Sequence, residues 1–519
     1  MPWLAAAVFV LTTFSLGCAA VGPNYVHPGT RSLHAQYSQP EVTHYYSQPF
    51  EQWWAQLFDP LLAELATKSL QQNLPVQESV WRICEARAVA GVVNGQLYPY
   101  MDGVGSVAAV KRSPNARRNL NANGTPYSLF SFGFDSRWEI DVFGRIRRET
   151  EAAVAEWGAA AEASDDLKRI LVADVAATYV TIRMQQELLR VTEANQQMQV
   201  DHRRRAESRF RAGTVGRLDV VQAQQVAEST AAEIPLIEQQ LKLAIHQLYL
   251  LLGQTPDGSL EQRLGIAPIP TPNLIEIGVP ADLLRRRPDV RKAEREVVAA
   301  SAMIGVATSE LYPRLTLNGA ISLDSRHLSS LVEYDSLAFG IGPGVRWNLL
   351  SLGRIQQSIQ AREAAYQQAV LRYQQSVIVA AGEVENAIAQ FDYGQQRVTL
   401  LDRAARSAHE AMQLAIAQYD AGVVGLERIL SAQRKLLEAQ QLLVEAQSAV
   451  SLAAVRTYKA AGGGWNTRLA SAPASSNVQD PRSAMPYDPS ARPTSASSAS
   501  TNEVSRPPQT RLPDVDEWQ

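Results

Sequence analysis

Residues 138–146 read Trp-Glu-Ile-Asp-Val-Phe-Gly-Arg-Ile, and at Gly144 the alternating pattern of a β-strand gives way to a very long helical pattern. Residues 347–355 read Trp-Asn-Leu-Leu-Ser-Leu-Gly-Arg-Ile, so Trp, Gly, Arg and Ile recur at matching positions with an offset of 209 residues (138 to 347). The same offset relates two further pairs, residues 210–216 (FRAGTVG) to 419–425 (YDAGVVG) and Gly253 to Gly462. Three agreements at one offset predict an internal twofold repeat.

The length and charge of the chain limit the classes of protein it can be. Its 519 residues exceed the usual reach of a single core, whereas two halves of about 200 residues each are ordinary units. The net charge is −3 and no basic run is dense enough to bind phosphates, which argues against nucleic acid as a partner. After the first twenty residues no apolar run reaches the roughly 18 residues of a membrane-spanning helix, so a membrane role requires strands.

The first residues have the pattern of a secretory signal. Residues 4–18 contain an apolar region followed by Ser-Leu-Gly-Cys. This ending resembles the lipobox of bacterial lipoproteins, which implies that residues 1–17 are a signal peptide and that Cys18 becomes the acylated first residue. Ala19, where Asp would retain a lipoprotein elsewhere, implies the outer membrane as the destination. The sequence departs from the pattern in having Ser15 where Leu is usual and no Lys or Arg before the apolar region. The alternative is an ordinary cleaved signal with an incidental cysteine.

Cys84 is the other of the two cysteines. With Cys18 committed to lipid, Cys84 has no partner for an internal disulfide. We therefore predict that it is a small, buried, apolar residue on a helix.

Two pairs of strands are predicted, one after each Leu-Tyr-Pro sequence (97–99 and 311–313). In three of the four strands apolar and polar residues alternate, which gives the sheet one apolar and one polar face. The apolar positions are Phe130, Phe132, Phe134, Trp138 and Ile140, then Leu315, Leu317, Ile321 and Leu323, and then Leu337, Phe339, Ile341, Val345 and Trp347. The remaining strand, about Tyr100 to Lys111, is rich in Gly and Ala and is placed by symmetry. Lengths of roughly ten residues fit tilted membrane-crossing strands, although the inner face of a soluble β-sandwich would alternate too.

Two stretches without proline, Arg145 to Arg211 and Arg354 to Asp420, predict helices of about 100 Å each. Such lengths far exceed a small domain of about 30 Å and indicate a coiled-coil assembly or a tube. Each helix turns at an Ala-Gly pair into a shorter partner, at 218–252 and 426–459. Pro235 is expected to interrupt and bend the first of these partners.

These patterns together predict a mixed α and β membrane protein with the following organisation. Residues 1–17 are the signal peptide, 18–60 a lipid-anchored extended segment, 61–253 the first repeat, 254–281 a linker, 282–465 the second repeat, and 466–519 a disordered tail rich in Ser, Pro and Ala. Each repeat contains helices, a strand pair and a long helical hairpin. The loops 113–125 and 325–336 between paired strands would lie outside the cell.

Four strands per chain are too few to close in a membrane, because an open edge leaves backbone groups unpaired in lipid. The chain must therefore oligomerise, to give eight, twelve or sixteen strands. An aqueous interior argues against eight, since side chains fill a barrel of that size. The pattern leaves open whether the assembly is a trimer or a tetramer.

An ordered series of motifs from residue 18 to residue 465 resembles the TolC-like outer-membrane factors, in particular their nodulation T lipoprotein branch. The motifs are Cys18 with Gly22-Pro23-Asn24-Tyr25; Trp53-Trp54 with Phe58-Asp59-Pro60; Trp138-Glu139-Ile140-Asp141 with Phe143-Gly144-Arg145; residues 282–290 (DLLRRRPDV); Leu311-Tyr312-Pro313; and Tyr458-Lys459 with Gly462-Gly463-Gly464-Trp465. The resemblance implies a homotrimer in which a twelve-stranded β-barrel in the outer membrane continues as a long α-helical barrel across the periplasm. It also implies two protein partners, a periplasmic adaptor and an inner-membrane pump of the resistance-nodulation-division type.

The function implied is that of a passive exit duct for drugs or other small toxic solutes. The sequence has no phosphate-binding G-x-x-x-x-G-K-[ST] loop, and its seven histidines lack metal-ligand spacing, so we expect no enzyme activity and no cofactor. Acidic residues such as Glu383 and Glu385 are expected on a solvated helix face. Two alternatives remain open at this point: a duct for secreted proteins, and a structural coiled-coil lipoprotein of the periplasm with a soluble β domain.

The hairpin tips are the predicted functional site. By resemblance they form the closed periplasmic end and the surface met by the adaptor, which implicates Gly213, Val215, Gly216, Leu218, Asp219, Gly422, Val424, Gly425 and Leu426. The glycines also serve simply to make the turns. Where the family's second hairpin commonly has Asp, this chain has Ser431, so a ring of carboxylates at the constriction is missing there. The candidates for the gate are Glu427, Arg428, Ser431 and Arg434.

Overall fold

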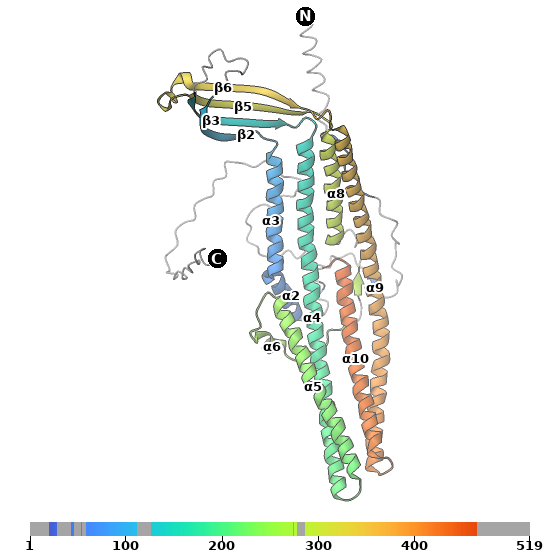
Figure 1. The fold of residues 1–519 in the computed structure, drawn as a ribbon. Coiled ribbons are helices and arrows are strands. Elements are labelled where there is room, and N and C mark those ends of the chain that lie inside the picture. Colours follow the sequence, from blue (N-terminus) through green and yellow to red (C-terminus); the bar gives the residue numbers. More distant parts are fainter. Residues whose placement is uncertain are drawn as a thin grey trace. The chain divides into compact units, whose positions relative to one another are not determined.

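A computed structural model describes residues 20–28, 43–45, 53, 59–111, 126–272, 275–277 and 286–463 (Figure 1). Several predicted features lie outside these residues: the signal peptide, Cys18, the loop 113–125, residues 282–285 of the DLLRRRPDV motif, and the tail 466–519. The described residues all belong to one unit of the chain, which ends at Ala470.

A four-stranded antiparallel sheet carries the strands expected from the alternation (Figure 1). The strands are β2 (Tyr100–Val110), β3 (Tyr127–Ile140), β5 (Arg314–Ser325) and β6 (Leu337–Arg346), in the order β2-β3-β5-β6. The loop between β5 and β6 contains two short 3-10 turns, η3 (Leu328–Ser330) and η4 (Tyr334–Ser336). Within the described residues, β2 and β6 each have only one neighbour in this sheet, so each presents a free edge.

The register of the sheet places apolar residues beside one another. Phe134 is paired with Ile321, and Ile321 is paired with Phe339. One residue further along, Asp135 is paired with Ala320, which in turn is paired with Gly340. Successive side chains point to opposite faces, so the sheet has one apolar face and one face of polar and small residues, as predicted.

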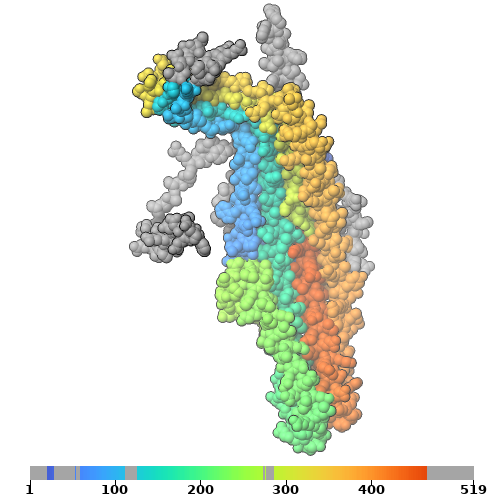
Figure 2. All heavy atoms as spheres, in the orientation of Figure 1, coloured from blue at the N-terminus to red at the C-terminus, as the bar shows by residue number. Residues whose placement is uncertain are grey.

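Two long helical hairpins extend from the sheet (Figure 1). The first consists of α4 (Arg145–Arg211) and α5 (Arg217–Leu251), and the second of α9 (Leu352–Asp420) and α10 (Leu426–Ala460). These bounds lie within two residues of the predicted ones. The hairpins pack together because α10 lies against both α9 and α4, and Figure 2 shows this packing as continuous surface.

Three shorter helices pack along the hairpins. Of these, α3 (Leu74–Gly95) and α8 (Pro288–Ser309) lie next to the sheet, and α2 (Pro60–Gln72) lies at the end of α3 that is far from the sheet (Figure 1). Near the sheet, α4 lies between α3 and α8, and α8 in turn packs on α9; further away, α4 lies between α5 and α10. The helices therefore follow the strand order, with α3 and α5 on the side of β2 and with α9 on the side of β6. Among the described residues no helix is both long enough and apolar enough to cross a membrane.

Four expectations differ from the structure. The helix α5 continues through Pro235. This proline is exposed, and the packing of α5 along α4 holds the helix together. Gly144 directly precedes α4 with a φ of 77°, but Gly353, which matches it at the offset of 209 residues, lies inside the first turn of α9. Cys84 is on a helix but is exposed, because α3 touches its neighbours along a narrow stripe only.

The stretch expected to be a plain linker is the fourth difference. It contains a short helix, α6 (Ser259–Leu264), and a strand, β4 (Ile275–Ile277). That strand pairs in parallel with β1 (Thr43–Tyr45), which lies in the N-terminal segment. Three-residue strands of this kind are too short to produce a recognisable alternation in the sequence.

Candidate functional site

The two hairpin tips have the same backbone geometry. Gly213 and Gly422 follow their helices with φ of 72° and 74°, and the amides after them, of Thr214 and Val423, donate to carbonyls of the last helical turn at 3.0 and 2.9 Å. This is the left-handed cap that favours glycine. A Cβ built at either glycine meets no atom within 4 Å, so the positive φ is the reason for glycine here.

A cluster around Arg209 joins the two tips. The Arg209 guanidinium donates to the carbonyl of Tyr419 at 3.2 Å and lies 3.4 Å from the Asp420 carboxylate. Its Cζ also stands 4.1 Å above the ring centre of Tyr419, which is only 4% exposed. Arg205 adds a longer contact of 3.9 Å to Asp420. We call Arg205, Arg209, Tyr419 and Asp420 the tip clamp, since it connects the end of α4 with the end of α9.

The predicted contact residues of the tips divide into two groups. Those on the surface or half-buried are Gly213, Val215, Gly216, Leu218, Asp219, Gly422, Val424 and Gly425. Leu426 is 2% exposed and belongs to an apolar cluster with Ile429, Leu430 and Met412, on which Val424 also packs. Its side chain therefore holds the second hairpin together and is not presented to a partner in this conformation.

The predicted gate residues lie along one exposed side of α10. Glu427, Arg428 and Arg434 are exposed and Ser431 is half-buried. Within the described part of the chain, none of the three charged residues forms an ion pair. Sequence reasoning placed these residues at the tip but missed the tip clamp, because nothing in the sequence indicates which residue of α9 meets Arg209.

A second charged cluster lies where α8 begins and α10 ends. Arg287, 1% exposed, donates to the Ala460 carbonyl at 3.0 Å, to both oxygens of Asp289 at 2.6 and 3.0 Å, and to Glu383 at 2.7 Å. Arg169 of α4 donates to the carbonyl of the preceding residue, Lys459, at 2.6 Å. Two buried guanidinium groups thus cap the free carbonyls at the end of α10. This explains the Arg-Pro-Asp part of the DLLRRRPDV motif. Glu383 remains exposed on its helix, as expected, and in addition pairs with Arg287.

Burial by itself would raise the pKa of Asp289. The hydrogen bonds and charge of Arg287, together with the charge of Arg169, outweigh that effect and hold the pKa below its ordinary value. A lowered carboxyl pKa contributes stability that is present above the unfolded pKa and is lost only as the pH falls through the folded one. The cluster is therefore built to stay ionised at neutral and mildly acidic pH.

The described N-terminal segment is fastened beside the start of α4. Arg148 donates to the Asn24 side chain at 2.7 Å and to the Val21 carbonyl at 3.2 Å, and the Val21 amide donates to the Phe143 carbonyl at 3.0 Å. A Cβ on Gly22 would come within 2.4 Å of the Gly305 backbone, so the segment approaches α8 as closely as a glycine permits. The Gly-Pro-Asn-Tyr motif is thus a docking sequence.

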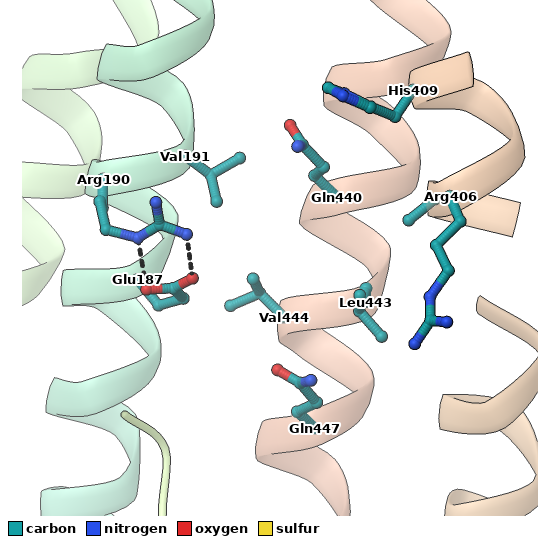
Figure 3. A pocket seen from close by; sticks show the side chains of 10 residues that line it. Glu187, Arg190, Val191, Arg406, His409, Gln440, Leu443, Val444 and Gln447 are labelled. Atoms are coloured by element: carbon teal, nitrogen blue, oxygen red, sulfur yellow. Dashed lines mark hydrogen bonds and ion pairs between the residues drawn. The ribbon is translucent and has the colours of Figure 1, made fainter. Parts of the chain in front are cut away.

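A groove of about 370 Å³ follows α10 between α4 and α9 (Figure 3). Its floor is formed by α10, and its walls carry Glu187 and Arg190 of α4, which pair at 2.6 Å, and Arg406 and His409 of α9. The stretch after α6 crosses the helices on this same side, because Ile269 packs against the cluster that contains two groove residues, Val191 and Val444.

The chain matches the family described as outer membrane efflux protein over residues 65–254 and 279–463, which is more than half of its length. The chain belongs to this family. It is 31% identical to nodulation protein T of Rhizobium leguminosarum bv. trifolii over 421 residues, 80% of this chain and 88% of that protein. It is 29% identical to the toluene efflux pump outer membrane protein TtgI of Pseudomonas putida over 413 residues, 79% of this chain and 86% of the relative.

Among solved structures, that of the outer-membrane channel OprN superimposes with a TM-score of 0.81 at 30% identity, covering 86% of this chain and 99% of that one. The family is one of transport channels. The resemblance read from the motifs is thereby confirmed, and the protein is an outer-membrane efflux channel.

Proposed function

We propose that three copies of this chain form a continuous duct, with a twelve-stranded β-barrel in the outer membrane and a helical barrel in the periplasm. The observation that carries this proposal is the open sheet. Its edges at β2 and β6 leave backbone groups unpaired, and lipid cannot satisfy them. Pairing β2 of one copy with β6 of the next closes the ring, and three copies give an interior wide enough for water.

The helices next to the two free edges of the sheet also expose apolar side chains that no other part of the chain covers. On the β2 side the exposed apolar residues are Leu74, Val80, Trp81, Val89 and Val92 of α3 with Leu236, Leu243 and Leu250 of α5; on the β6 side they are Leu371, Ile378, Val379, Tyr393, Leu400 and Leu414 of α9. An interface between different surfaces of identical chains generates a ring when the rotation closes. Exposed Cys84 on α3 would then lie at a boundary between copies.

The two halves of the chain are best explained as a duplication. The indole nitrogen of Trp138 donates to the Leu97 carbonyl at 2.8 Å, and that of Trp347 donates to the Leu311 carbonyl at 3.0 Å. Each bond ties the end of a strand pair to the Leu-Tyr-Pro sequence that opened it. Equivalent bonds and equivalent tips support the internal repeat, and with it the division into residues 61–253 and 282–465.

The partners and cargo follow from the family and its named relatives. TtgI belongs to a toluene efflux pump, which supports small toxic solutes as the cargo of this duct. We propose that an inner-membrane pump of the resistance-nodulation-division type and a periplasmic adaptor supply that cargo, with the adaptor meeting the exposed tip residues. The docked segment 20–28 would then hold the barrel next to lipid chains on Cys18, since it begins two residues after that cysteine.

The tips are proposed to close the duct, with the tip clamp holding the second hairpin in place beside the first. An exposed ion pair contributes about 0.2–1 kcal/mol and a cation–π contact about 0.5–1 kcal/mol, so each clamp is weak. Three clamps acting together sum to several kcal/mol, which is enough to decide which of two states is populated. Glu427, Arg428, Ser431 and Arg434 are proposed to line the closed end.

Replacing both Arg209 and Asp420 by Ala is expected to raise the mean single-channel conductance in planar lipid bilayers by about twofold or more, because the closed state loses its clamp. The matched control is Asp402→Ala, which removes an ion pair to Arg406 at 2.8 Å within α9 alone and should leave conductance unchanged. Conductance of the clamp variant equal to that of the control would remove the clamp from the gate. A complete absence of current from the unmodified protein would contradict the duct itself.

A further inference from the structure

The two strand pairs of the sheet are related by two constant offsets. An offset of 214 residues (97 to 311) carries residues 97–99, which precede β2, onto residues 311–313, which precede β5. An offset of 209 residues (138 to 347) carries Trp138 of β3 onto Trp347, which directly follows β6. The first offset therefore relates the first strands of the two pairs, and the second offset relates their second strands.

The offsets reproduce the register of one strand pair from that of the other. Tyr100 of β2 is paired with Arg137 of β3. The offsets carry these two residues onto Arg314 and Arg346, which are paired between β5 and β6. Since both ladders continue from there residue by residue, the equivalence of the two strand pairs extends to their register.

The junction between β3 and β5 has a counterpart at the free edges of the sheet. It joins the second strand of one pair to the first strand of the next pair, and in a ring of copies β6 of one copy meets β2 of the next in the same way. Gly133 of β3 is paired with Ser322 of β5. The same two offsets, 209 added to the first residue and 214 subtracted from the second, convert this pair into Gly342 of β6 and Ala108 of β2.

We propose that β6 of one copy pairs antiparallel with β2 of the next in the register that places Gly342 opposite Ala108. The partner at each free edge is thus a second copy of this chain, bound in the same way as β3 is bound to β5. The inference rests on the proposed duct and specifies the residues that seal it. Three further pairs follow from this register: Gly340 with Val110, Val345 with Gly105, and Trp347 with Gly103.

The side chains along the two edges fit this register. Gly103 leaves a gap on the apolar face of β2, and Phe134 reaches it from the β3 side, because a Cβ built on Gly103 would lie 3.8 Å from a ring carbon of Phe134. From the other side the register brings Trp347 to Gly103 and Val345 to Gly105, and in the single chain these two side chains are 53% and 68% exposed. Large side chains beside glycine cover the strand backbone that glycine leaves bare.

The alternation of faces limits the other registers. A shift by one residue would bring the apolar side chains of β6 beside the polar face of β2, which is excluded for a sheet between lipid and water. Shifts by two residues keep the faces matched, so these are the registers that an experiment has to separate.

The test uses four double-cysteine variants of the full chain in which Cys84 is replaced by Ser. Gly342→Cys with Ala108→Cys, and Gly340→Cys with Val110→Cys, place the two thiols directly opposite each other. Exchanging the partners, to Gly342→Cys with Val110→Cys and Gly340→Cys with Ala108→Cys, places the same four cysteines two residues out of register. All four positions lie on the polar face, where an aqueous oxidant reaches them, and a Cβ on Gly340 or Gly342 meets no atom within 4 Å.

The distances between strands set the expected result. In an antiparallel pair, opposed Cα atoms lie about 4.5–5.5 Å apart, which a disulfide spans, whereas residues displaced by two lie about 7–8 Å apart. After oxidation of outer membranes, each matched variant should therefore give about fivefold more reducible dimer and trimer on denaturing gels than either exchanged variant.

Equal or stronger cross-linking of an exchanged variant, or no cross-linking of any variant in a protein with the mass of a trimer, would overturn the register and leave the ring of copies standing. A monomer mass for the unmodified protein would instead contradict the duct. If a cysteine at Gly340 or at Gly342 prevents assembly, the two variants that carry the other one still compare a matched pair with an exchanged pair.

Discussion

The Arg287→Ala variant is expected to lose most of its correctly assembled protein. Arg287 is buried and bonds at once to α8, α9 and α10 through Asp289, Glu383 and the Ala460 carbonyl. Its removal leaves the half-buried Asp289 carboxylate without its principal partner and the end of α10 without a cap. Breaking one side of such a buried ionic cluster costs about 3–5 kcal/mol.

That loss should lower the temperature at which the helical circular dichroism of the detergent-solubilised protein disappears by roughly 5–10 °C. The natural control is Arg286→Ala, because Arg286 is the adjacent residue of the same motif but is exposed. The role assigned to Arg287 would be wrong if the two variants unfolded at the same temperature.

The second large effect concerns the apolar face of the sheet. Ile341 of β6 is 76% exposed in the single chain, and in the proposed barrel it faces lipid. A positive charge at the bilayer midplane costs about 2–4 kcal/mol per side chain, and a trimer bears this cost three times. Ile341→Arg is therefore expected to abolish recovery of the protein from the outer-membrane fraction.

Ala320→Arg provides the comparison for this variant. Ala320 lies on the polar face of the neighbouring strand, paired in register with Asp135, so an arginine there would face water and a carboxylate. We expect near-normal amounts in the outer membrane, measured by quantitative immunoblotting of fractionated membranes. Equal recovery of the two variants would mean that the apolar face does not meet lipid.

Much of this architecture could be predicted because it depends on short-range patterns. The helix α4 begins and ends at the predicted residues, next to Gly144 and Gly213. A glycine with positive φ interrupts a helix through its own backbone, independently of contacts with distant segments. The alternation along β3, β5 and β6 gave each residue its face, and the register then placed Phe134, Ile321 and Phe339 together. Even β2, whose sequence is poor in large side chains, followed from the symmetry of the two halves.

What could not be predicted depends on contacts between distant segments. Burial of Cys84 was expected from its residue type. Within one chain, however, the neighbouring elements cover only a narrow stripe of the surface of α3, and Cys84 lies outside that stripe. Pro235 was expected to interrupt and bend its helix, but tertiary packing keeps α5 continuous at that residue. The Arg287 cluster was visible as a motif, but its partners Ala460 and Glu383 are 173 and 96 residues away. The tip clamp leaves no local signal for the same reason.

The mass of the protein in detergent tests the central claim most directly. Light scattering on the detergent-solubilised full-length protein, corrected for bound detergent, should give three times the mass of one polypeptide. Heating should then release the single chain. A monomer that remains soluble without detergent after Cys18→Ser would contradict the shared barrel and the duct built on it.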